Sequence, residues 1–375
     1  MDSEIYNSSA VGIFDGGSQR GGHLIRCGGG ANALEVVASV PQRIVDQFHL
    51  RGGQEISGAV DGRRGTARYA QLTSVETIDG LDPMERQRRT PFLRATTVSP
   101  SKRLNTETAG GPLATRLIDL FAPLGKGQRA LVVAPPKAGK TVLLQQIAKG
   151  VAENHPQCHL MVLLIDERPE EVTEFRRTVG AEMFASSNDE PTANHARIAQ
   201  LAFDRAKSLA EAGRDVVLLL DSLTRLARAC NVAMSTSGRT MSGGLDSRAM
   251  ERPRQLFALA RATEESGSLT TIATVLVETG SRMDELIFQE FKGTGNMEIV
   301  LDRKAAEQRL FPAINLQATG TRREELLLSP SEIAAAQIMR RAAAAGKPES
   351  TLPALMERME KTKNNGELVD LLARR

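Results

Sequence analysis

The stretch APPKAGKT, residues 134–141, decides the fold class of this chain. It fits the phosphate-binding loop known as Walker A, with Ala134 in place of the usual first glycine. The apolar run ALVV before it predicts a buried strand, and VLLQQIA after it predicts a helix. A turn without a ligand is the weaker alternative, because strand, loop and helix all fall where the motif requires them.

The backbone of this loop explains how it would bind phosphate. Pro135 and Pro136 have no amide hydrogen, whereas the amides from Lys137 to Thr141 can donate at the positive end of a helix dipole. We expect Lys140 to reach the terminal phosphates and the Thr141 hydroxyl to face Mg²⁺.

Two acidic strand ends complete the predicted nucleotide site. Asp221 follows the apolar run LLL, where a carboxylate can hold Mg²⁺ through water. Glu167 ends the run LLIDE, and we predict that it polarises the attacking water. Glu170 and Glu171 lie in the first turn of a predicted helix, where acids complement the dipole, so we exclude them from the catalytic set.

An arginine must face the γ-phosphate as charge develops there. The candidates are Arg309, Arg322 and Arg323. The stretch GTRR, residues 320–323, lies beyond the last predicted sheet elements, which suits a neighbour's site better than its own and implies a ring. Phe311 can stack on adenine, and core packing is an equally weighted alternative.

Composition limits the class of protein. A chain of 375 residues predicts two or more domains, and 41% hydrophobic residues support a packed core. There is no run of about 18 apolar residues and no signal-peptide pattern, so we expect no membrane span. Three scattered cysteines disfavour a disulfide framework or a zinc site, which indicates a cytoplasmic protein. Because the net charge is only +3, a nucleic-acid surface must be local.

The chain divides into four predicted segments. Residues 1–83 are Gly-rich and alternating, which predicts a small β-rich module such as a five-stranded barrel of the OB or cold-shock type. Residues 84–114 form a basic linker. Residues 115–328 alternate apolar runs with helical patterns, which predicts an α/β domain with a parallel sheet. Residues 329–375 predict a helical tail without chemistry of its own.

Particular elements are expected within these segments. The first module should contain a strand over residues 34–40 and a short helix over 44–48. The α/β domain should contain strands over residues 130–133, 160–165, 216–220 and 271–277, and helices over 193–212 and 248–264.

The N-terminal module and the linker offer candidates for nucleic-acid contact. In the module these are His23, Arg26, Arg68 and Tyr69, weighed evenly against ordinary core and surface roles. The part of the linker from residue 84 to 103 carries a single acid, Glu85, against Arg86, Arg88, Arg89, Arg94, Lys102 and Arg103. Such blocks are usually solvated, and a basic strap for a phosphate backbone is the minority interpretation.

Two polar, Gly-rich loops of the α/β domain are further candidates. Residues 231–246 contain Arg239, and residues 278–292 contain Arg282 in a Thr-Gly-Ser-Arg turn and Lys292 before Gly-Thr-Gly. In an ATP-driven ring these candidate RNA loops would line the central hole and contact phosphates without reading bases. Plain surface loops are the alternative.

Together these motifs resemble the Rho family of bacterial transcription termination factors. The resemblance rests on residues 134–141, on LLIDERPEEVTE (163–174), on LLLDSLTRLARA (218–229), on residues 267–285 and on residues 291–328. It is specific from about residue 115 to 328 and weaker in residues 90–112 and the tail. It implies a homohexameric, RecA-like ATPase that translocates 5′ to 3′ on RNA and releases transcripts from RNA polymerase.

The resemblance also implies roles for individual residues. The catalytic set is Lys140, Glu167, Asp221, Arg309 and Arg322, and Thr141 and Asp221 hold Mg²⁺. ATP is bound by Gly125, Lys126, Gly127, Gln128, Arg129, Ala130, Lys137, Ala138, Gly139, Lys140, Thr141, Val142, Arg168 and Phe311. RNA is bound by Arg26, Tyr69, Arg239, Thr279, Gly280, Arg282 and Lys292.

The N-terminal module departs from the family pattern. Family members usually carry a Gly-Phe-Gly-Phe run and a further tyrosine for stacking pyrimidines. This chain has GGHLIR at residues 21–26 and no aromatic in residues 36–39, but it keeps Arg26 and Tyr69. We therefore predict weakened or altered RNA loading with an intact motor. Arg282 replaces the lysine usual in its turn, which keeps the charge but changes its geometry.

Other functions stay open on the sequence alone. A rotary or secretion-type ATPase shares the fold, the Walker A loop and the arginine finger, but lacks the candidate RNA loops. A regulatory, non-catalytic Rho paralogue is disfavoured because every expected catalytic position is filled. The partners that the resemblance implies are RNA, an RNA polymerase elongation complex and a NusG-type elongation factor. No membrane partner is expected.

Overall fold

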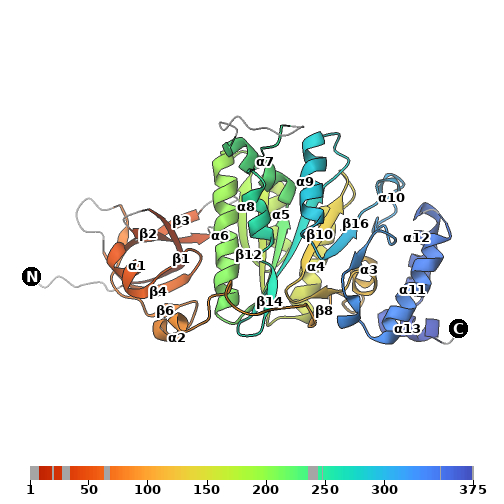
Figure 1. Ribbon diagram of the computed structural model, residues 1–375, viewed down its shortest axis with the longest axis horizontal. Coiled ribbons are helices and arrows are strands. Elements are labelled where there is room, and N and C mark those ends of the chain that lie inside the picture. Colours follow the sequence, from red (N-terminus) through yellow and green to blue (C-terminus); the bar gives the residue numbers. More distant parts are fainter. Residues whose placement is uncertain are drawn as a thin grey trace, which may run out of the picture.

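The structure, a computed structural model, describes residues 8–18, 21–27, 34–62, 68–234, 244–246, 248–346 and 348–373. A small barrel, a central α/β layer and a helical end follow one another along the longest axis (Figure 1). No helix in these ranges is both long and apolar enough to cross a membrane.

The first module is a closed barrel. Its strands pair in the order β1 (Ser8–Ser18), β2 (Gly21–Cys27), β3 (Leu34–Pro41), β5 (Ala70–Leu72) and β4 (Glu55–Asp61), and β4 pairs back with β1. Strand β6 (Thr77–Ile78) extends β4, and helix α1 (Gln42–Phe48) packs on β2 and β3. The predicted five-stranded barrel, its third strand and its short helix are confirmed. Leu24 and Ile25 are buried, as their core interpretation requires.

The α/β domain is built on one sheet. Its parallel strands run in the order β12 (Glu182–Ser187), β11 (His159–Glu167), β13 (Asp215–Asp221), β15 (Ser268–Leu276), β10 (Arg129–Ala134) and β16 (Met297–Val300). All four predicted strands are therefore present. The antiparallel β17 (Gly320–Thr321) pairs with β16, β14 (Arg261–Thr263) pairs with β15, and β7 (Thr97–Val98) pairs with β14. The carboxyl ends of the parallel strands meet at one edge.

Helices cover both faces of this sheet. On one face lie α3 (Leu113–Phe121), α4 (Lys140–Asn154) and α5 (Pro169–Thr178), and on the other α6 (Thr192–Glu211), α7 (Leu223–Met234), α8 (Glu251–Phe257) and α9 (Arg282–Lys292). Strand β10 shows the division, because Ala130 and Val132 belong to the first apolar core, whereas Leu131 and Val133 belong to the second. The predicted helix over residues 193–212 is confirmed as α6.

The predicted helix over residues 248–264 is wrong in its second half. Helix α8 ends at Phe257, and the chain then enters β14, where Arg261 pairs with Leu269 of β15. Hydrogen bonds to a strand that follows in the sequence override the local helical pattern.

The tail forms three helices, α11 (Pro330–Ala344), α12 (Pro348–Glu360) and α13 (Asn365–Ala373). Ser329 and Glu332 form a capping box at the start of α11. Apolar residues of all three helices join the core that lies over α3 and α4. The tail is thus part of the α/β domain's packing, at the opposite end from the barrel (Figure 1).

Two arginines of the linker are buried or paired, contrary to both interpretations of this segment. Arg86, in helix α2 (Pro83–Gln87), is 2% exposed. Arg103, in β8 (Arg103–Leu104), forms an ion pair with Glu332 at 2.6 Å and donates to the carbonyl of Asp119 at 2.8 Å. Strand β8 itself pairs with β9 (Leu124–Gly125). These cations stabilise the fold and are not free to contact phosphates.

Candidate nucleotide site and RNA-facing loops

The phosphate-binding loop joins β10 to α4. Lys137 and Gly139 have φ values of 64° and 86°, which curl the backbone, and α4 begins at Lys140. The amides of this first turn lie at the positive end of a 15-residue helix, a position that favours an anion. The amide of Ala138 already donates to the carbonyl of Pro135 at 3.3 Å, so it is less available than we expected.

Lys140 lies between the two acidic strand ends. Its Nζ donates to Oε1 of Glu167 at 2.9 Å and to Oδ2 of Asp221 at 2.6 Å. Both carboxylates are buried. They lie close together because β11 and β13 are neighbours in the sheet and end side by side. Three of the five residues that the sequence assigned to catalysis therefore meet at one point.

The charged groups of this cluster shift one another's pKa values. Burial alone would lower the pKa of Lys140, but Asp221 and Glu167 outweigh it and raise the pKa, so the amine stays charged at neutral pH. Burial and then the nearby Asp221 raise the pKa of Glu167, while Lys140 and Arg225 act in the opposite direction, and the net pKa is raised. A glutamate with a raised pKa is better matched to proton transfer near neutrality than a solvated one.

The oxygen donors in the cluster suit Mg²⁺. The Thr141 hydroxyl lies 3.5 Å from Lys140 Nζ, which itself touches Asp221. Oδ1 of Asp221 accepts from the hydroxyl of Thr274 at 2.6 Å, so that hydroxyl orients the carboxylate. Hydroxyl and carboxylate oxygens together with nucleotide phosphates are the usual ligands of Mg²⁺.

A pocket of about 500 Å³ adjoins the loop. It is lined by Lys137, Ala138, Gly139 and Val142 on the loop side and by Phe311 on the other. A side chain at Gly139 would lie 3.5 Å from the ring of Phe311, so this ring stands beside the loop. Phe311 is 43% exposed, which does not fit core packing and leaves its face open to a base.

Two predicted arginines lie at the rim of this site. Arg168 is exposed and directly follows Glu167, as the N-cap of α5. Arg309 is exposed with a φ of 61° in the turn that follows α10 (Arg303–Glu307), two residues before Phe311. Neither side chain touches the Lys140 cluster in this structure.

Residues 125–130 do not lie at this site. They precede or begin β10, whereas the phosphate-binding loop follows its last residue, roughly 17 Å away along the strand. Lys126 is paired with Asp215 at 2.6 Å, at the amino end of β13. The expectation that Gly125, Gly127 and their neighbours bind the nucleotide held by the same subunit's loop is therefore not supported, because they occupy the opposite edge of the sheet.

Arg322 lies at that opposite edge as well. Its amide donates to the carbonyl of Asn296, whose own amide donates to the carbonyl of Arg129. Burial lowers the pKa of Arg129, and the nearby cations Arg261 and Arg322 lower it further. No ion pair joins any of these three arginines to a carboxylate within the described residues. These three residues are the arginine cluster, in which Arg129 and Arg261 donate to backbone carbonyls and none of the three is paired with a carboxylate among the described residues.

The candidate RNA loops are only partly described. Arg239 lies outside the described residues. The Thr279 hydroxyl donates a hydrogen bond to Asp284 at 2.6 Å, and Arg228 donates to the same buried carboxylate at 2.8 Å. These bonds fix the turn around Gly280 to helix α9.

The second loop is largely helical, which corrects the prediction. Residues from Arg282 to Lys292 form helix α9, and these two exposed cations stand at its two ends, about 15 Å apart. The Nζ of Lys292 lies 5.7 Å from the centre of the Phe288 ring in the same helix. A side chain at Gly244 would lie 3.7 Å from Met283, so the described end of the first loop adjoins the start of α9, beside Arg282.

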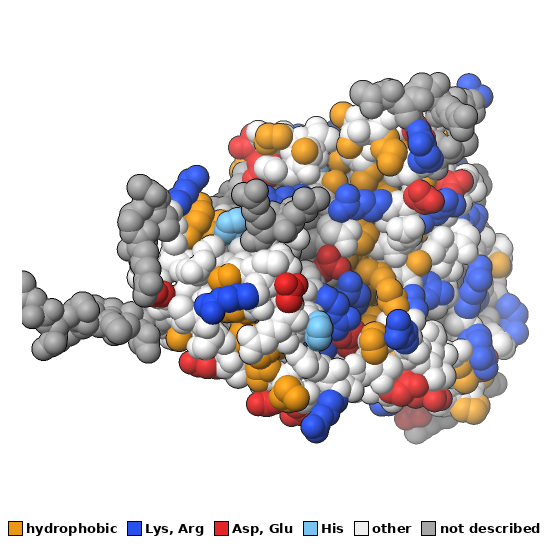
Figure 2. All heavy atoms as spheres, turned by 60° about the vertical axis from the view of Figure 1, so that its left-hand side comes forward, with side chains coloured by type: hydrophobic (Ala, Val, Ile, Leu, Met, Phe, Trp, Pro, Cys, Tyr) orange, Lys and Arg blue, Asp and Glu red, His pale blue; other side chains and the backbone are white. Residues whose placement is uncertain are grey.

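The candidate RNA contacts of the barrel gather around one aromatic residue. The rings of His23 and Tyr69 meet edge to face at 5.9 Å, and Arg68 lies 5.3 Å above the ring of Tyr69. Arg26 is exposed and donates to the carbonyl of Val11 at 3.2 Å. On the face drawn in Figure 2, basic and acidic side chains are intermixed and form no continuous basic field, in keeping with the low net charge.

Sequence reasoning missed several residues of the nucleotide site. Arg225 lies 3.3 Å from Glu167, and Thr274 orients Asp221. Met356 and Glu360 of α12 line the pocket beside Phe311, although the tail seemed to carry no chemistry. Arg225 had a signal, since it lies in the first turn of α7, four residues after Asp221 at the end of β13, whereas the other contacts depend on tertiary packing.

Known proteins resemble this chain in sequence. Residues 114–319 match the ATP synthase alpha/beta family, nucleotide-binding domain. Transcription termination factor Rho of Pseudomonas aeruginosa is 48% identical over 88% of this chain and 80% of its own length. Its namesakes in Streptomyces lividans and Borreliella burgdorferi are 49% and 50% identical over 85% of this chain. The chain spans only 46% and 62% of the length of these two relatives.

Solved structures show a similar fold. A prototypical ATPase from the type III secretion system of pathogenic bacteria superposes with a TM-score of 0.60 over 75% of this chain and 77% of its own, at 24% identity. The assembled ATPase EscN from enteropathogenic E. coli gives 0.58 over 75% and 65%, also at 24% identity. At this identity the likeness concerns the fold alone.

Proposed function

The chain belongs to the transcription termination factor Rho family, and we propose that it is an ATP-driven RNA translocase that ends transcription by releasing the nascent transcript. The observation that carries the proposal is the meeting of Lys140, Glu167 and Asp221 beside the phosphate-binding loop. A secretion-type ATPase shares the fold, but the relatives that match most of this chain at about 48% identity are Rho factors.

ATP hydrolysis is assigned to the carboxyl edge of the sheet. Lys140 binds the terminal phosphates. Their negative charge then takes the place of the Glu167 and Asp221 carboxylates as the ion-pair partner of the lysine. Glu167, with its raised pKa, accepts the proton of the attacking water. Thr141 and Asp221 would hold Mg²⁺, which neutralises phosphate charge when bound. Val142 and Phe311 enclose the base.

The arginine cluster at the other edge serves the next subunit of a homohexameric ring. Arg322 is about a strand length from its own loop, so it cannot reach a phosphate bound there. With Arg129 and Arg261 it forms a cluster of three cations, which suits a neighbour's γ-phosphate. Arg309 lies at the rim of its own subunit's base pocket, near Phe311, and supports the nucleotide bound there.

RNA contact is assigned to two regions. Arg282, Thr279 and Gly280, together with Arg239, line the central hole and grip phosphates. Arg26 and Tyr69 provide a weaker primary site, because residues 21–26 and 36–39 lack the aromatics that usually stack on bases in the family. The division at residues 83, 114 and 328 separates this primary site from the motor and the tail. An RNA polymerase elongation complex and a NusG-type factor complete the proposal, with the cytoplasm as its setting.

The test is the rate of ATP turnover with and without RNA, measured beside the particle mass. The proposal expects RNA to stimulate turnover in a particle of about six subunits. Lys140→Ala, purified in parallel, should abolish turnover in both conditions. Turnover that is indifferent to RNA would favour the secretion-type ATPase, and full turnover by a monomer would contradict the shared site.

A further inference from the structure

We infer that Asp79 and Arg86 are positioning residues, which lock the N-terminal module onto helix α6 so that RNA held by the module reaches the candidate RNA loops at a fixed place. The inference rests on the proposed RNA function for its consequence. The lock itself is a statement about the fold and can be tested without RNA.

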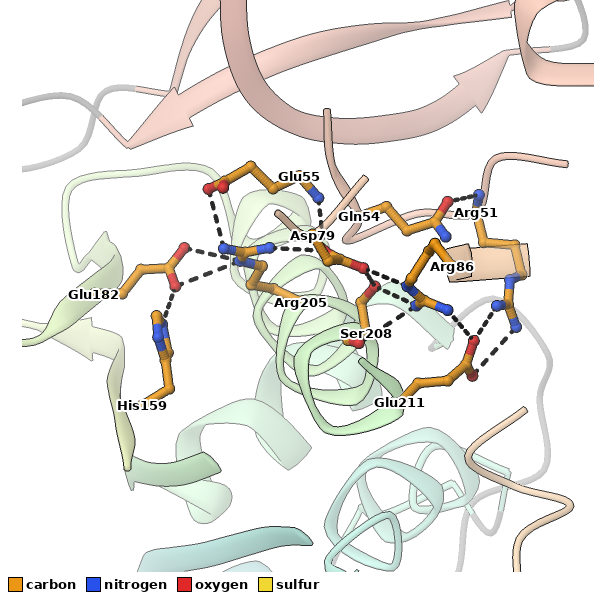
Figure 3. A network of polar contacts seen from close by, with 10 residues as sticks. All are labelled: Arg51, Gln54, Glu55, Asp79, Arg86, His159, Glu182, Arg205, Ser208 and Glu211. Atoms are coloured by element: carbon orange, nitrogen blue, oxygen red, sulfur yellow. Dashed lines mark hydrogen bonds and ion pairs between the residues drawn. The ribbon is translucent and has the colours of Figure 1, made fainter. Parts of the chain in front are cut away.

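Asp79 is the centre of a buried polar network between the module and the ATPase domain (Figure 3). It lies in the turn after β6, and its side chain is wholly buried. It accepts hydrogen bonds from Arg86 at 2.9 Å, from Arg205 at 3.1 Å and from the hydroxyl of Ser208 at 2.6 Å. One carboxylate of the module is thus held by the linker helix α2 and by two turns of α6.

Glu211, at the end of α6, forms the second centre. It accepts from Arg86 at 2.8 Å, from the amide of Phe92 at 2.8 Å and from Arg51 of the module. Burial alone would raise the pKa of Glu211, but these donors outweigh it and lower the pKa, so the carboxylate is ionised. Because Arg86 donates to both Asp79 and Glu211, it joins the two centres.

The network reaches the central sheet. Arg205 also donates to Glu55 of β4 at 3.0 Å and to Glu182 of β12 at 3.2 Å. Glu182 in turn pairs with His159, the first residue of β11, at 2.6 Å. Figure 3 shows these side chains converging on Arg205 from the module and from the sheet. Strand β11 ends at Glu167, so the network and the catalytic glutamate share one strand.

Close backbone contact accompanies the charges. Gly53 has a φ of 87°, and a side chain there would lie 2.2 Å from the backbone of Asp204 in α6. Ile13 and Ile25 of the module are buried in the same apolar core as α6. Helix α6 stands between the barrel and the sheet and touches both (Figure 1). A hinge motion at this buried interface would separate paired charges and leave them unpaired, which opposes such a motion.

A locked module has a consequence for RNA. A strand that binds the module and the candidate RNA loops together gains from a high effective concentration, provided that the two sites keep a fixed separation. A module tethered only by the linker would lose this gain, although each site would still bind RNA by itself.

The first test uses the fluorescence of Tyr69 in the module; tryptophan is absent from the chain, and its second tyrosine, Tyr6, lies outside the described residues. Tyrosine fluorescence therefore follows the module, and far-UV circular dichroism follows the helices of the rest. The two signals should change together as urea unfolds the parent protein. In Asp79→Asn, which keeps the turn but removes the charge, the tyrosine signal should change at lower urea.

The matched control is Arg197→Ala. Arg197 joins α6 to Asp15 of the module at 2.6 Å, but its side chain is 58% exposed, so its loss should leave the two signals together. Should Asp79→Asn fail to fold, Ser208→Ala, which removes the buried hydroxyl that donates to Asp79 at 2.6 Å, takes its place with the same expected direction. Coincident, unshifted transitions in the variant would overturn the lock.

The second test concerns RNA. Asp79→Asn should raise the concentration of a long RNA needed for half-maximal ATPase stimulation about tenfold or more. Basal turnover and stimulation by a short oligonucleotide that reaches only the candidate RNA loops should be unchanged. An unchanged long-RNA response would overturn the consequence. If RNA fails to stimulate the parent protein, the proposed function falls, while the tyrosine test still decides the lock.

Discussion

Lys140 occupies the position that a nucleotide's phosphates would contest. In this structure it neutralises Glu167 and Asp221, at 2.9 and 2.6 Å, and it is the only cation that touches both among the described residues. Phosphate binding must draw the amine away from at least one carboxylate. Glu167 is then free to act on water, and Asp221 is free to accept a metal ion.

Glu167→Gln should separate binding from chemistry. Glutamine keeps the shape and one oxygen for Lys140, but it cannot accept a proton from water. We expect ATP affinity to change little and RNA-stimulated turnover to fall about 10²- to 10⁴-fold. Nucleotide binding and single-turnover hydrolysis measure the two effects. Turnover within tenfold of the parent would exclude Glu167 as the base.

Arg225 should set the pH dependence of turnover. Glu167 must be ionised to act as the base. Because its pKa is raised, its ionised form, and with it turnover, is lost at a higher pH than for an ordinary glutamate as the pH falls. Arg225 lowers that pKa, so Arg225→Gln should raise it further and move the acid limb of the kcat profile to higher pH. Arg177→Gln, which removes an exposed arginine in the last turn of α5, is the control. An acid limb shifted to lower pH would contradict the assignment.

Gly150 shows how packing between elements reverses a local preference. It lies inside α4, where alanine is favoured over glycine by about 1 kcal/mol. A side chain there, however, would lie 2.2 Å from the carbonyl of Thr106. Thr106 cannot yield easily, because its amide and hydroxyl both donate to the buried Asp119, at 3.0 and 2.8 Å.

Gly150→Ala should therefore destabilise the protein by about 1–3 kcal/mol instead of stabilising it. The urea midpoint measures the effect. Lys149→Ala, its exposed neighbour in the same helix, should change stability by less than about 0.5 kcal/mol. A higher midpoint for Gly150→Ala would show that the linker does not pack on α4 as described.

The ring as a whole can be tested by mixing two inactive variants. Glu167→Gln lacks the base but keeps the arginine cluster, and Arg322→Ala has the opposite defect. If each site combines Glu167 of one subunit with Arg322 of the next, mixed rings contain some complete sites. Random assembly of equal amounts gives about a quarter of such sites, so turnover should return in part.

Each variant alone is the control for this mixture. Arg322→Ala should still bind ATP, because its own phosphate-binding loop lies at the other edge of the sheet. A mixture as inactive as its two components, in particles shown to contain both, would indicate that Arg322 does not act across the interface.

The sequence alone determined the elements of the α/β domain and their order. The apolar runs that became β10, β11, β13 and β15 and the helical period that became α6 are local properties, so they are visible without the fold. The Walker A loop between a strand and a helix then identified the carboxyl edge. Lys140, Glu167 and Asp221 could be grouped because parallel strands end together.

Only the tertiary structure decided which residues are available and where they stand. The sequence predicts that Arg86 is solvated, yet it is buried between the nearby Asp79 and Glu211, which is distant in the sequence. Arg129 reads as part of the nucleotide site, yet the length of β10 puts it at the far edge beside Arg322. Lys292 reads as a loop cation, yet α9 carries it away from Arg282. Local sequence encodes period and chemistry, whereas burial and position depend on contacts between residues that are distant along the chain.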